Sequence, residues 1–368
     1  MKKREVKKRI LIVASFPPPL HGSAVVSQYI KESKVINGSF ICDYVNLSTS
    51  RKMDEIGKDS PFKVLRLVFA LLKEFFLLLT HRYALCYLAI TCHGKGFLKD
   101  APFVLLCKLF GRKIVIHQHN KGMSRDIGRW PYSWLLPLCY KNAKVILLSW
   151  KLYPDAKKVV RKENVYICSN GISDVRIATK IASPSVPRLL FLSNLMISKG
   201  VYVLLDSLKI LNDNGCVFCC DIIGEETKEI NAMKLKHEIA KRGLQNVINY
   251  HGVKYGAEKE QILCEADIFV HPTLDDCFPL VLLEAMKYKL PIVATDVGGI
   301  SDMIKNEENG LICERNNPVE FAKCIQILLD DADSCRTKGA KGKALFDRLF
   351  TLDVFERSLC GILENVIE

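Results

Sequence analysis

Residues 275–286 (DDCFPLVLLEAM) decide the fold, because they join two apolar runs that are typical of buried strands. Residues 267–271 (DIFVH) precede them, and residues 291–295 (PIVAT) follow them. Pro279 suits the first position of a helix, because its ring fixes φ and it has no N–H group to satisfy. A strand, a turn, a helix and a second strand in this order predict a parallel sheet covered by helices.

The helix that Pro279 opens is apolar on nearly every side, which predicts that it is buried. Glu284 lies inside this helix, and a buried carboxylate requires hydrogen-bond donors or a cation. The N–H groups at a helix start favour phosphate, and the carboxylate can accept from hydroxyl groups. We therefore expect a ligand site here. Two alternatives stay open: Asp276 as the N-cap of the helix, and Glu284 as a partly exposed helix glutamate.

Strand-like runs alternate with helix-like segments along the whole chain, which is typical of parallel α/β sheets. Six such runs lie in the first half, at residues 10–15, 41–47, 84–90, 113–117, 144–149 and 165–168. Six more lie in the second half, at residues 188–193, 216–223, 247–251, 267–271, 291–295 and 310–313. The Pro/Ser-rich segment 182–187 (ASPSVP) separates the two sets. We expect two doubly wound domains, with ligands bound beyond the carboxyl ends of the strands.

The opening stretch resembles the signature of glycosyltransferase family 4, in which two acidic residues flank a Phe-Pro-Leu or Phe-Gly-Leu sequence. Here the pair is Asp276 and Glu284, with Asp276 in the place of the usual Glu. The resemblance implies the α/β GT-B fold, in which two Rossmann-like domains face each other across a cleft. It also implies three parts: an acceptor-binding domain at 1–182, a nucleotide-sugar donor-binding domain at 187–350, and a C-terminal helix at 351–368 that crosses back to the first domain.

The same resemblance implies donor-binding roles in the second domain. Asp276 would contact the donor sugar, and Glu284 would bind the ribose hydroxyls. Backbone groups at the helix start would hold the pyrophosphate, at Phe278, Pro279, Leu280 and Val281. The family usually places Arg and Lys on the donor diphosphate; Lys199 matches the Lys, and Asn194 stands in place of the Arg. Gly224 matches a glycine at the end of the next strand. A surface lysine at a helix start remains an alternative for Lys199.

Two segments of the first half also match this family. Gly22 and Ser23 open a helix after the first strand, and small residues there let a phosphate approach the backbone closely. His119 closes the strand run IVIHQH and is implied to point toward the transferred sugar. Three alternatives remain: an ordinary turn at Gly22, a structural pair of His117 and His119, and a metal site at this pair, for which no third ligand is evident.

The formal net charge of +13 predicts anionic partners such as nucleotide phosphates or an anionic membrane surface. The basic start MKKREVKKR fits either a solvated face or attachment to anionic lipid. Residues 62–79 (FKVLRLVFALLKEFFLLL) predict a core helix with one polar stripe, and an interfacial helix is the alternative. No run of 18 uncharged apolar residues occurs, so we expect no spanning helix. No nucleic-acid-binding motif is present, so we expect no nucleic-acid partner.

The 15 cysteines are scattered through apolar runs, where free cysteine behaves as a small hydrophobe. Cys216, Cys219 and Cys220 lack a second pair at zinc-site spacing, and their segment reads as a strand. The odd count and the absence of a secretory signal favour the reducing cytosol. We therefore expect a cytoplasmic protein without metal or cofactor, and its charge is compatible with peripheral attachment to the inner face of the membrane.

These observations and the resemblance predict a retaining, metal-independent hexosyltransferase. It would move a sugar from a nucleotide-sugar to a glycan or lipid-linked glycan, in surface polysaccharide biosynthesis. His119, Asp276 and Lys199 are the predicted catalytic residues. The alternative is a catalytically degenerate module that binds nucleotide-sugar or glycan, which Asp276 and Asn194 favour. A sugar-nucleotide 2-epimerase would need acid/base carboxylates that the sequence does not place.

Overall fold

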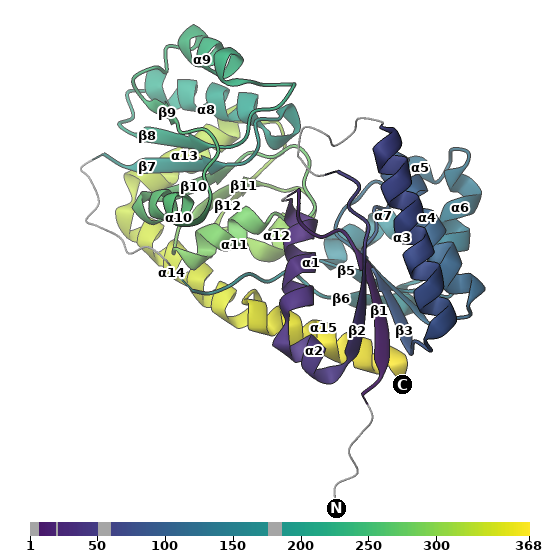
Figure 1. Ribbon diagram of the computed structural model, residues 1–368. Coiled ribbons are helices and arrows are strands. Elements are labelled where there is room, and N and C mark those ends of the chain that lie inside the picture. Colours follow the sequence, from purple (N-terminus) through teal and green to yellow (C-terminus); the bar gives the residue numbers. More distant parts are fainter. Residues whose placement is uncertain (1–6, 20, 51–59, 176–185) are drawn as a thin grey trace, which may run out of the picture. The chain divides into compact units, whose positions relative to one another are not determined.

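The computed structural model describes residues 7–19, 21–50, 60–175 and 186–368. The contacts within the chain divide it into two compact units (Figure 1). Unit 1 comprises Met1–Gly171 and Leu352–Glu368, and unit 2 comprises Ile172–Thr351. Each unit encloses its own hydrophobic core, as expected for a domain of this size.

Unit 1 is a parallel sheet with helices on its faces. Among its described residues six strands pair in the order β2-β1-β3-β4-β5-β6. The strands are β1 (Arg9–Ala14), β2 (Ile41–Asn46), β3 (Leu85–Leu88), β4 (Ile114–Gln118), β5 (Lys144–Leu147) and β6 (Val165–Ile167). The helices are α1 (Gly22–Glu32), α2 (Lys34–Ser39), α3 (Pro61–Thr80), α4 (Gly94–Leu109), α5 (Met123–Asp126), α6 (Tyr132–Tyr140), α7 (Tyr153–Ala156) and α15 (Leu352–Ile367).

Unit 2 repeats this architecture with a different strand order. Its six described strands pair as β12-β11-β10-β7-β8-β9. The strands are β7 (Arg188–Leu192), β8 (Cys219–Ile223), β9 (Ile248–Tyr250), β10 (Ile268–His271), β11 (Ile292–Thr295) and β12 (Gly310–Cys313). The helices are α8 (Val201–Asp213), α9 (Ala232–Lys241), α10 (Gly256–Glu265), α11 (Leu280–Lys287), α12 (Ile300–Met303), α13 (Pro318–Asp330) and α14 (Ala332–Leu349).

Each sheet has one point at which the strand order reverses. In unit 2 this switch point lies between β7 and β10, because β8 and β9 continue on one side and β11 and β12 on the other. This is the 3-2-1-4-5-6 order of dinucleotide-binding folds, and in unit 1 the corresponding switch lies between β1 and β3. Loops at such points diverge to opposite faces of the sheet and leave room for a ligand.

All twelve predicted strand runs contain a strand, and both sheets are parallel, so the predicted doubly wound α/β class is confirmed. The largest shift is in the run 216–223, whose strand begins only at Cys219. Successive strand residues point to opposite faces, so Cys219 and Cys220 do not share one. Within the described part of the chain, no group of three His, Cys, Asp or Glu side chains is arranged to hold a metal ion.

The predicted domain boundary at 182–187 and the basic start of the chain lie largely outside the described residues. The contacts divide the chain earlier, after Gly171, and return to unit 1 at Leu352. The helix α15 buries Phe355, Leu359 and Leu363 against unit 1, with contacts to α2 and β3.

The predicted core helix at 62–79 is wrong in its orientation. The polar side chains of α3 face the protein: Arg66 donates to the carbonyl of Thr49 at 2.7 Å, Lys73 donates to that of Tyr44 at 2.8 Å, and Glu74 is buried. The opposite face is apolar and exposed. This apolar face of α3 consists of Phe62, Val64, Leu65, Val68, Phe69, Leu72, Phe75, Phe76 and Leu79, which are between 37% and 72% exposed. No helix among the described residues is long and apolar enough to cross a membrane.

Candidate functional site

Unit 2 brings Lys199 and Asp276 together at the switch point of its sheet. Lys199 follows β7 and Asp276 follows β10, and these two strands pair with each other. The Nζ atom of Lys199 lies 2.7 Å from Oδ2 of Asp276. The two predicted catalytic residues of this unit therefore form an ion pair at the position where a doubly wound sheet binds its ligand.

The loops that carry this ion pair are held by a close backbone approach. Gly200 has a φ of +77°, and a Cβ atom there would lie 1.9 Å from the carbonyl oxygen of Pro272. The carbonyl of Ser198 accepts from the N–H groups of Leu274 and Asp275 at 2.8 and 3.0 Å. A glycine directly after Lys199 is therefore required by the packing of one loop against the other.

Asp276 is held in its charged form. His271 Nε2 and Thr273 Oγ1 each lie 3.3 Å from Oδ2 of Asp276. Burial alone raises the pKa of Asp276, but the hydrogen bond of His271 and the charge of Lys199 outweigh it and hold this pKa well below its usual range. The N-cap of α11 is Pro279, so the alternative of Asp276 as that cap is wrong, and the helix begins one residue later than predicted.

Glu284 lies in the second turn of α11 and has one oxygen engaged. Its Oε1 accepts from Nζ of Lys259, on α10, at 2.8 Å. Its Oε2 is buried and has no hydrogen-bond partner among the described residues. A buried carboxylate oxygen without a donor is costly, so this atom is suited to accept from a ligand hydroxyl.

The start of α11 contains a buried aromatic side chain and backbone N–H groups that have no acceptor within the helix. The ring of Phe278 is buried and packs edge-on against Phe350, with ring centroids 6.0 Å apart, so this side chain serves the core. Leu280 and Val281 form the first turn, whose N–H groups lack intrahelical acceptors. Gly298 supports the preceding loop: its φ is +59°, and a Cβ atom there would lie 2.4 Å from the carbonyl oxygen of Asp276.

Gly224 and Asn194 meet where β7 and β8 end. A Cβ atom on Gly224 would lie 1.8 Å from the carbonyl oxygen of Ser193, directly before Asn194. The N–H group of Leu195 donates to the carbonyl of Glu225 at 2.9 Å, which ties the two loops together. Asn194 is half-buried at this junction and adds no charge beside Lys199.

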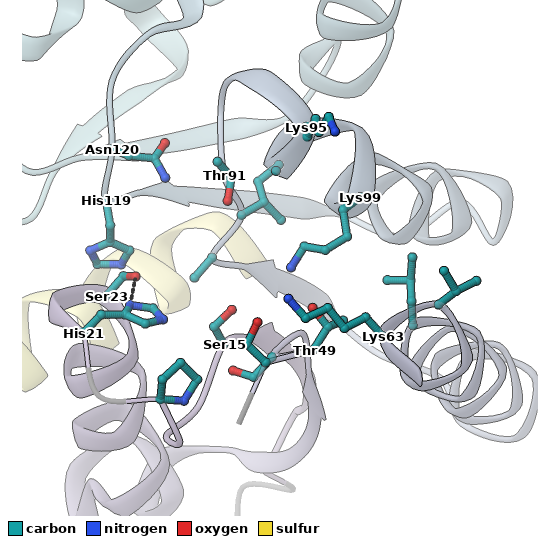
Figure 2. Close-up of a pocket in the computed structure, with 18 of the residues that line it drawn as sticks. Ser15, His21, Ser23, Thr49, Lys63, Thr91, Lys95, Lys99, His119 and Asn120 are labelled. Atoms are coloured by element: carbon teal, nitrogen blue, oxygen red, sulfur yellow. Dashed lines mark hydrogen bonds between the residues drawn. The ribbon is translucent and has the colours of Figure 1, made fainter. Parts of the chain in front are cut away.

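Unit 1 holds a cavity of about 610 Å³ at its own switch point (Figure 2). It is lined by residues that follow three neighbouring strands: His21 and Ser23 after β1, Thr91, Lys95 and Lys99 after β3, and His119 after β4. The helix α3 adds Lys63, Val64 and Leu67. No acidic side chain is among the described residues that line this cavity.

His119 reaches this cavity, whereas His117 is fully buried with its Nδ1 2.7 Å from the hydroxyl of Tyr87. The two imidazole rings are in contact, with centroids 4.1 Å apart and their planes tilted by 37°. Burial, with a smaller effect of His21, lowers the pKa of His119 to about 4, so the ring is neutral near pH 7. Both of its nitrogens are buried without a partner in the described structure, and a neutral imidazole offers one donor and one acceptor.

Gly22 and Ser23 open α1 beside the same cavity. His21 is the N-cap, and its Nδ1 lies 3.4 Å from the N–H group of Ala24 and 3.1 Å from the hydroxyl of Ser23. A Cβ atom on Gly22 would meet no atom within 4 Å, so the packing of the protein does not itself require glycine there. The predicted site residues therefore form two groups, one in each unit.

Several residues of these groups were not predicted from the sequence. Lys95 and Lys99 carry a recognisable signal, because they lie one helical turn apart at the start of the helix that follows a strand. His21 precedes the predicted Gly22 and could have been read as an N-cap. Lys63 and Lys259 carry no such signal, because only the fold brings them from distant helices to the cavity and to Glu284.

Residues 178–344, which cover most of unit 2, match the family model described as glycosyl transferases group 1. Unit 2 is a group 1 glycosyltransferase domain. The chain is also 28% identical over 212 residues to the amylovoran biosynthesis glycosyltransferase AmsK of Erwinia amylovora. This match covers 55% of this chain and 51% of AmsK. This chain spans about half the length of the curated relatives that it matches.

Solved glycosyltransferase structures match nearly the whole chain, beyond the domain in unit 2. Sucrose-phosphate synthase from Thermosynechococcus elongatus has a TM-score of 0.78 at 15% identity, over 98% of this chain and 99% of that one. HepE of Anabaena in complex with UDP-glucose has a TM-score of 0.71 at 16% identity, over 97% and 99%. The predicted GT-B fold, with two Rossmann-like domains, is confirmed.

Proposed function

We propose that this glycosyltransferase moves a sugar, with retention of anomeric configuration, from a nucleotide-sugar to a glycan or lipid-linked glycan. Unit 2 would bind the donor and unit 1 the acceptor. The observation that carries the proposal is the placement of Lys199 and Asp276 at the switch point of a group 1 glycosyltransferase domain, next to the helix that holds Glu284.

The donor is proposed to lie along α11. The first-turn N–H groups of Leu280 and Val281 and the ammonium of Lys199 would face its diphosphate. The open Oε2 of Glu284 would accept from the ribose hydroxyls, and Asp276 would orient the sugar. A bound UDP-glucose in the structurally similar HepE supports a nucleotide-sugar donor here.

The proposed chemistry relies on position and charge and requires no metal. The bond between the anomeric carbon and the diphosphate oxygen breaks, and the acceptor oxygen bonds to the same face of that carbon. The departing diphosphate oxygen takes the proton of the acceptor hydroxyl. Lys199 and the start of α11 would stabilise the negative charge that develops on the leaving group, and His119 would position the sugar from unit 1.

The acceptor is proposed to belong to surface polysaccharide assembly at the inner face of a membrane. The similarity to AmsK, which is named for amylovoran biosynthesis, supports a polysaccharide product. The net charge of +13 and the apolar face of α3 support peripheral attachment to an anionic membrane surface.

A donor screen tests this function. UDP-, GDP-, ADP- and CMP-sugars are added to wild type, to Glu284→Ala, and to Glu308→Ala, a control at an exposed glutamate of the same unit. A donor present at 100 times its Kd adds about 2.7 kcal/mol to the free energy of unfolding. We expect one nucleotide class to raise the melting temperature of wild type and the control, but not of Glu284→Ala.

The same donor is then offered with membrane extracts, and transfer or slow hydrolysis of the sugar is measured. Donor binding with neither reaction would replace the transferase by a degenerate binding module, with Asn194 and Asp276 as the departures responsible. Stabilisation of Glu284→Ala equal to that of wild type would contradict the proposed ribose contact.

A further inference from the structure

The cavity of unit 1 is positively charged on one side. Figure 2 shows the side chains of Lys63, from α3, and Lys99, from α4, directed toward each other within it. Lys99 is held in place by the carbonyl of Leu47 at 3.1 Å and by Asp100 at 3.0 Å. An ammonium group has three donors, so these contacts leave one for a ligand. Lys95 lines the same cavity one helical turn away.

The apolar face of α3 adjoins this cavity. Val64 belongs to both, because it lines the cavity and is 61% exposed, and Leu67 lines the cavity one turn farther along the helix. The face continues from Val64 along the whole helix to Leu79. An apolar surface of this length and continuity on one helix is unusual for water-facing structure and marks a partner or lipid surface.

The charged side chains of α3 lie on the side opposite its apolar face. Lys63, Arg66 and Lys73 are its cationic residues, and Glu74, its one acidic residue, is buried on the same side as they are. Burial raises the pKa of Glu74 to about 8, against a smaller effect of the Cys107 thiol, so this carboxyl is mostly uncharged near pH 7. A helix with an exposed apolar face and a basic polar face matches the boundary of an anionic bilayer.

We propose that the acceptor is a lipid phosphate: its phosphate enters the cavity at Lys63, Lys95 and Lys99, and its hydrocarbon chain leaves past Val64 along the apolar face of α3. Phosphate favours a site with several cationic donors, and hydrocarbon favours the adjoining helix face. This rests on the proposed function, since it names the acceptor class of the same enzyme, and it assigns one continuous site to the head and the tail of that acceptor.

Short amphiphiles test the two halves of the site separately. Octyl phosphate carries both features, octyl glucoside keeps the tail with a neutral head, and inorganic phosphate keeps the head alone. Each is titrated into the full chain by calorimetry, below its critical micelle concentration. We expect octyl phosphate to bind at least tenfold more tightly than either of the others. Equal binding of octyl phosphate and octyl glucoside would overturn the phosphate assignment.

Matched variants locate the binding. Lys99→Gln combined with Lys63→Gln should weaken octyl phosphate at least tenfold, while Lys157→Gln combined with Lys158→Gln, at exposed positions of the same unit, should not. Phe69→Ser with Leu72→Ser should abolish flotation with phosphatidylcholine vesicles that contain about one fifth phosphatidylglycerol. The control pair, Val217→Ser with Met233→Ser, is also exposed but lies in unit 2, and should float as wild type does.

Competition separates a phosphate acceptor from an ordinary phospholipid headgroup. Dihexanoyl phosphatidylglycerol should not displace octyl phosphate; efficient displacement would assign the cavity to bilayer phospholipid and overturn the proposal. The proposal would also be overturned if vesicle binding required the apolar face of α3 while the Lys63→Gln/Lys99→Gln variant bound octyl phosphate as tightly as wild type. These titrations contain no nucleotide, so their failure is distinct from a failure of donor binding in unit 2.

Discussion

At the scale of single residues, Gly200 shows how the position of a charged side chain depends on a residue without one. Two constraints coincide at this glycine: a left-handed backbone with φ of +77°, and the carbonyl of Pro272 where a Cβ atom would be. A side chain at position 200 would violate both constraints, and it could be accommodated only if the loop that carries Lys199 moved. Gly215 has the same φ of +77° with nothing within 4 Å, so the chain contains a control for the first constraint alone.

Gly200→Ala should therefore destabilise unit 2 more than Gly215→Ala does. The left-handed backbone costs about 1–2 kcal/mol in both variants. The clash with Pro272 should add about 1–3 kcal/mol in Gly200→Ala alone. Urea unfolding of both variants measures the difference, and equal losses would show that the loop yields to the methyl group without cost.

Residues that belong to one local motif could be predicted, and residues that meet across the fold could not. Asp276 and Glu284 lie eight positions apart in one strand–turn–helix segment, so their placement near one another follows from local structure. Lys259 reaches Glu284 from another helix, at 2.8 Å, and nothing in its own neighbourhood indicates this contact. Pairings of this kind depend on the packing of α10 against the sheet, which sequence periodicity does not specify.

At the scale of elements, α3 shows that a polar stripe can face inward. Its existence and its bounds were predicted within one or two residues, because a long run of strong helix formers begins at a proline. Its orientation was not predicted, because burial of apolar residues is only a tendency and backbone carbonyls of unit 1 satisfy the basic side chains. One consequence is the burial of Glu74, whose carboxyl oxygen Oε2 has no hydrogen-bond partner among the described residues.

Glu74 should make the protein less stable as the pH rises. Its pKa is about 8 when folded and 4.5 in the reference state, so between these values the folded form binds the proton and the unfolded form releases it. The free energy of unfolding then falls with rising pH by up to about 1.4 kcal/mol per pH unit. Well above pH 8 Glu74 is ionised in both states, and the free energy of unfolding no longer falls because of this group.

Glu74→Gln removes this titration. The free energy of unfolding of the variant, relative to that of wild type, should therefore rise by about 3 kcal/mol between pH 5 and pH 8. Urea unfolding at both pH values measures the gain. Glu163→Gln changes an exposed glutamate of the same unit and should show no such dependence. A constant difference between Glu74→Gln and wild type at the two pH values would exclude a raised pKa.

At the scale of the whole molecule, unit 1 is assembled from two distant stretches of chain. Lys113 donates to the carbonyl of Ile367 at 2.7 Å, across 254 positions, and α15 buries Leu359 completely. The alternating pattern of strands and helices was enough to predict two sheets. It could not specify which unit receives the last helix, because an amphipathic helix fits any apolar surface of suitable width.

Leu359→Ala should destabilise unit 1 by about 2–5 kcal/mol, as expected for a buried leucine. Hydrogen exchange followed by mass spectrometry should show faster exchange in β1 and β3 and unchanged exchange in β7 and β10. Leu349→Ala, at a leucine of unit 2 that is 44% exposed, is the control and should leave both units nearly unchanged. Faster exchange in unit 2 alone would show that α15 belongs to unit 2 and not to unit 1.

This discontinuity sets an order of events during translation. Residues 172–351 leave the ribosome as one contiguous stretch, so the domain they form has its whole sequence available before α15 is synthesised. Unit 1, although its strands are made before unit 2, has to remain without α15 until the ribosome has passed through all of unit 2. Of the two units, the one whose translation begins earlier is therefore the one whose folding is completed later.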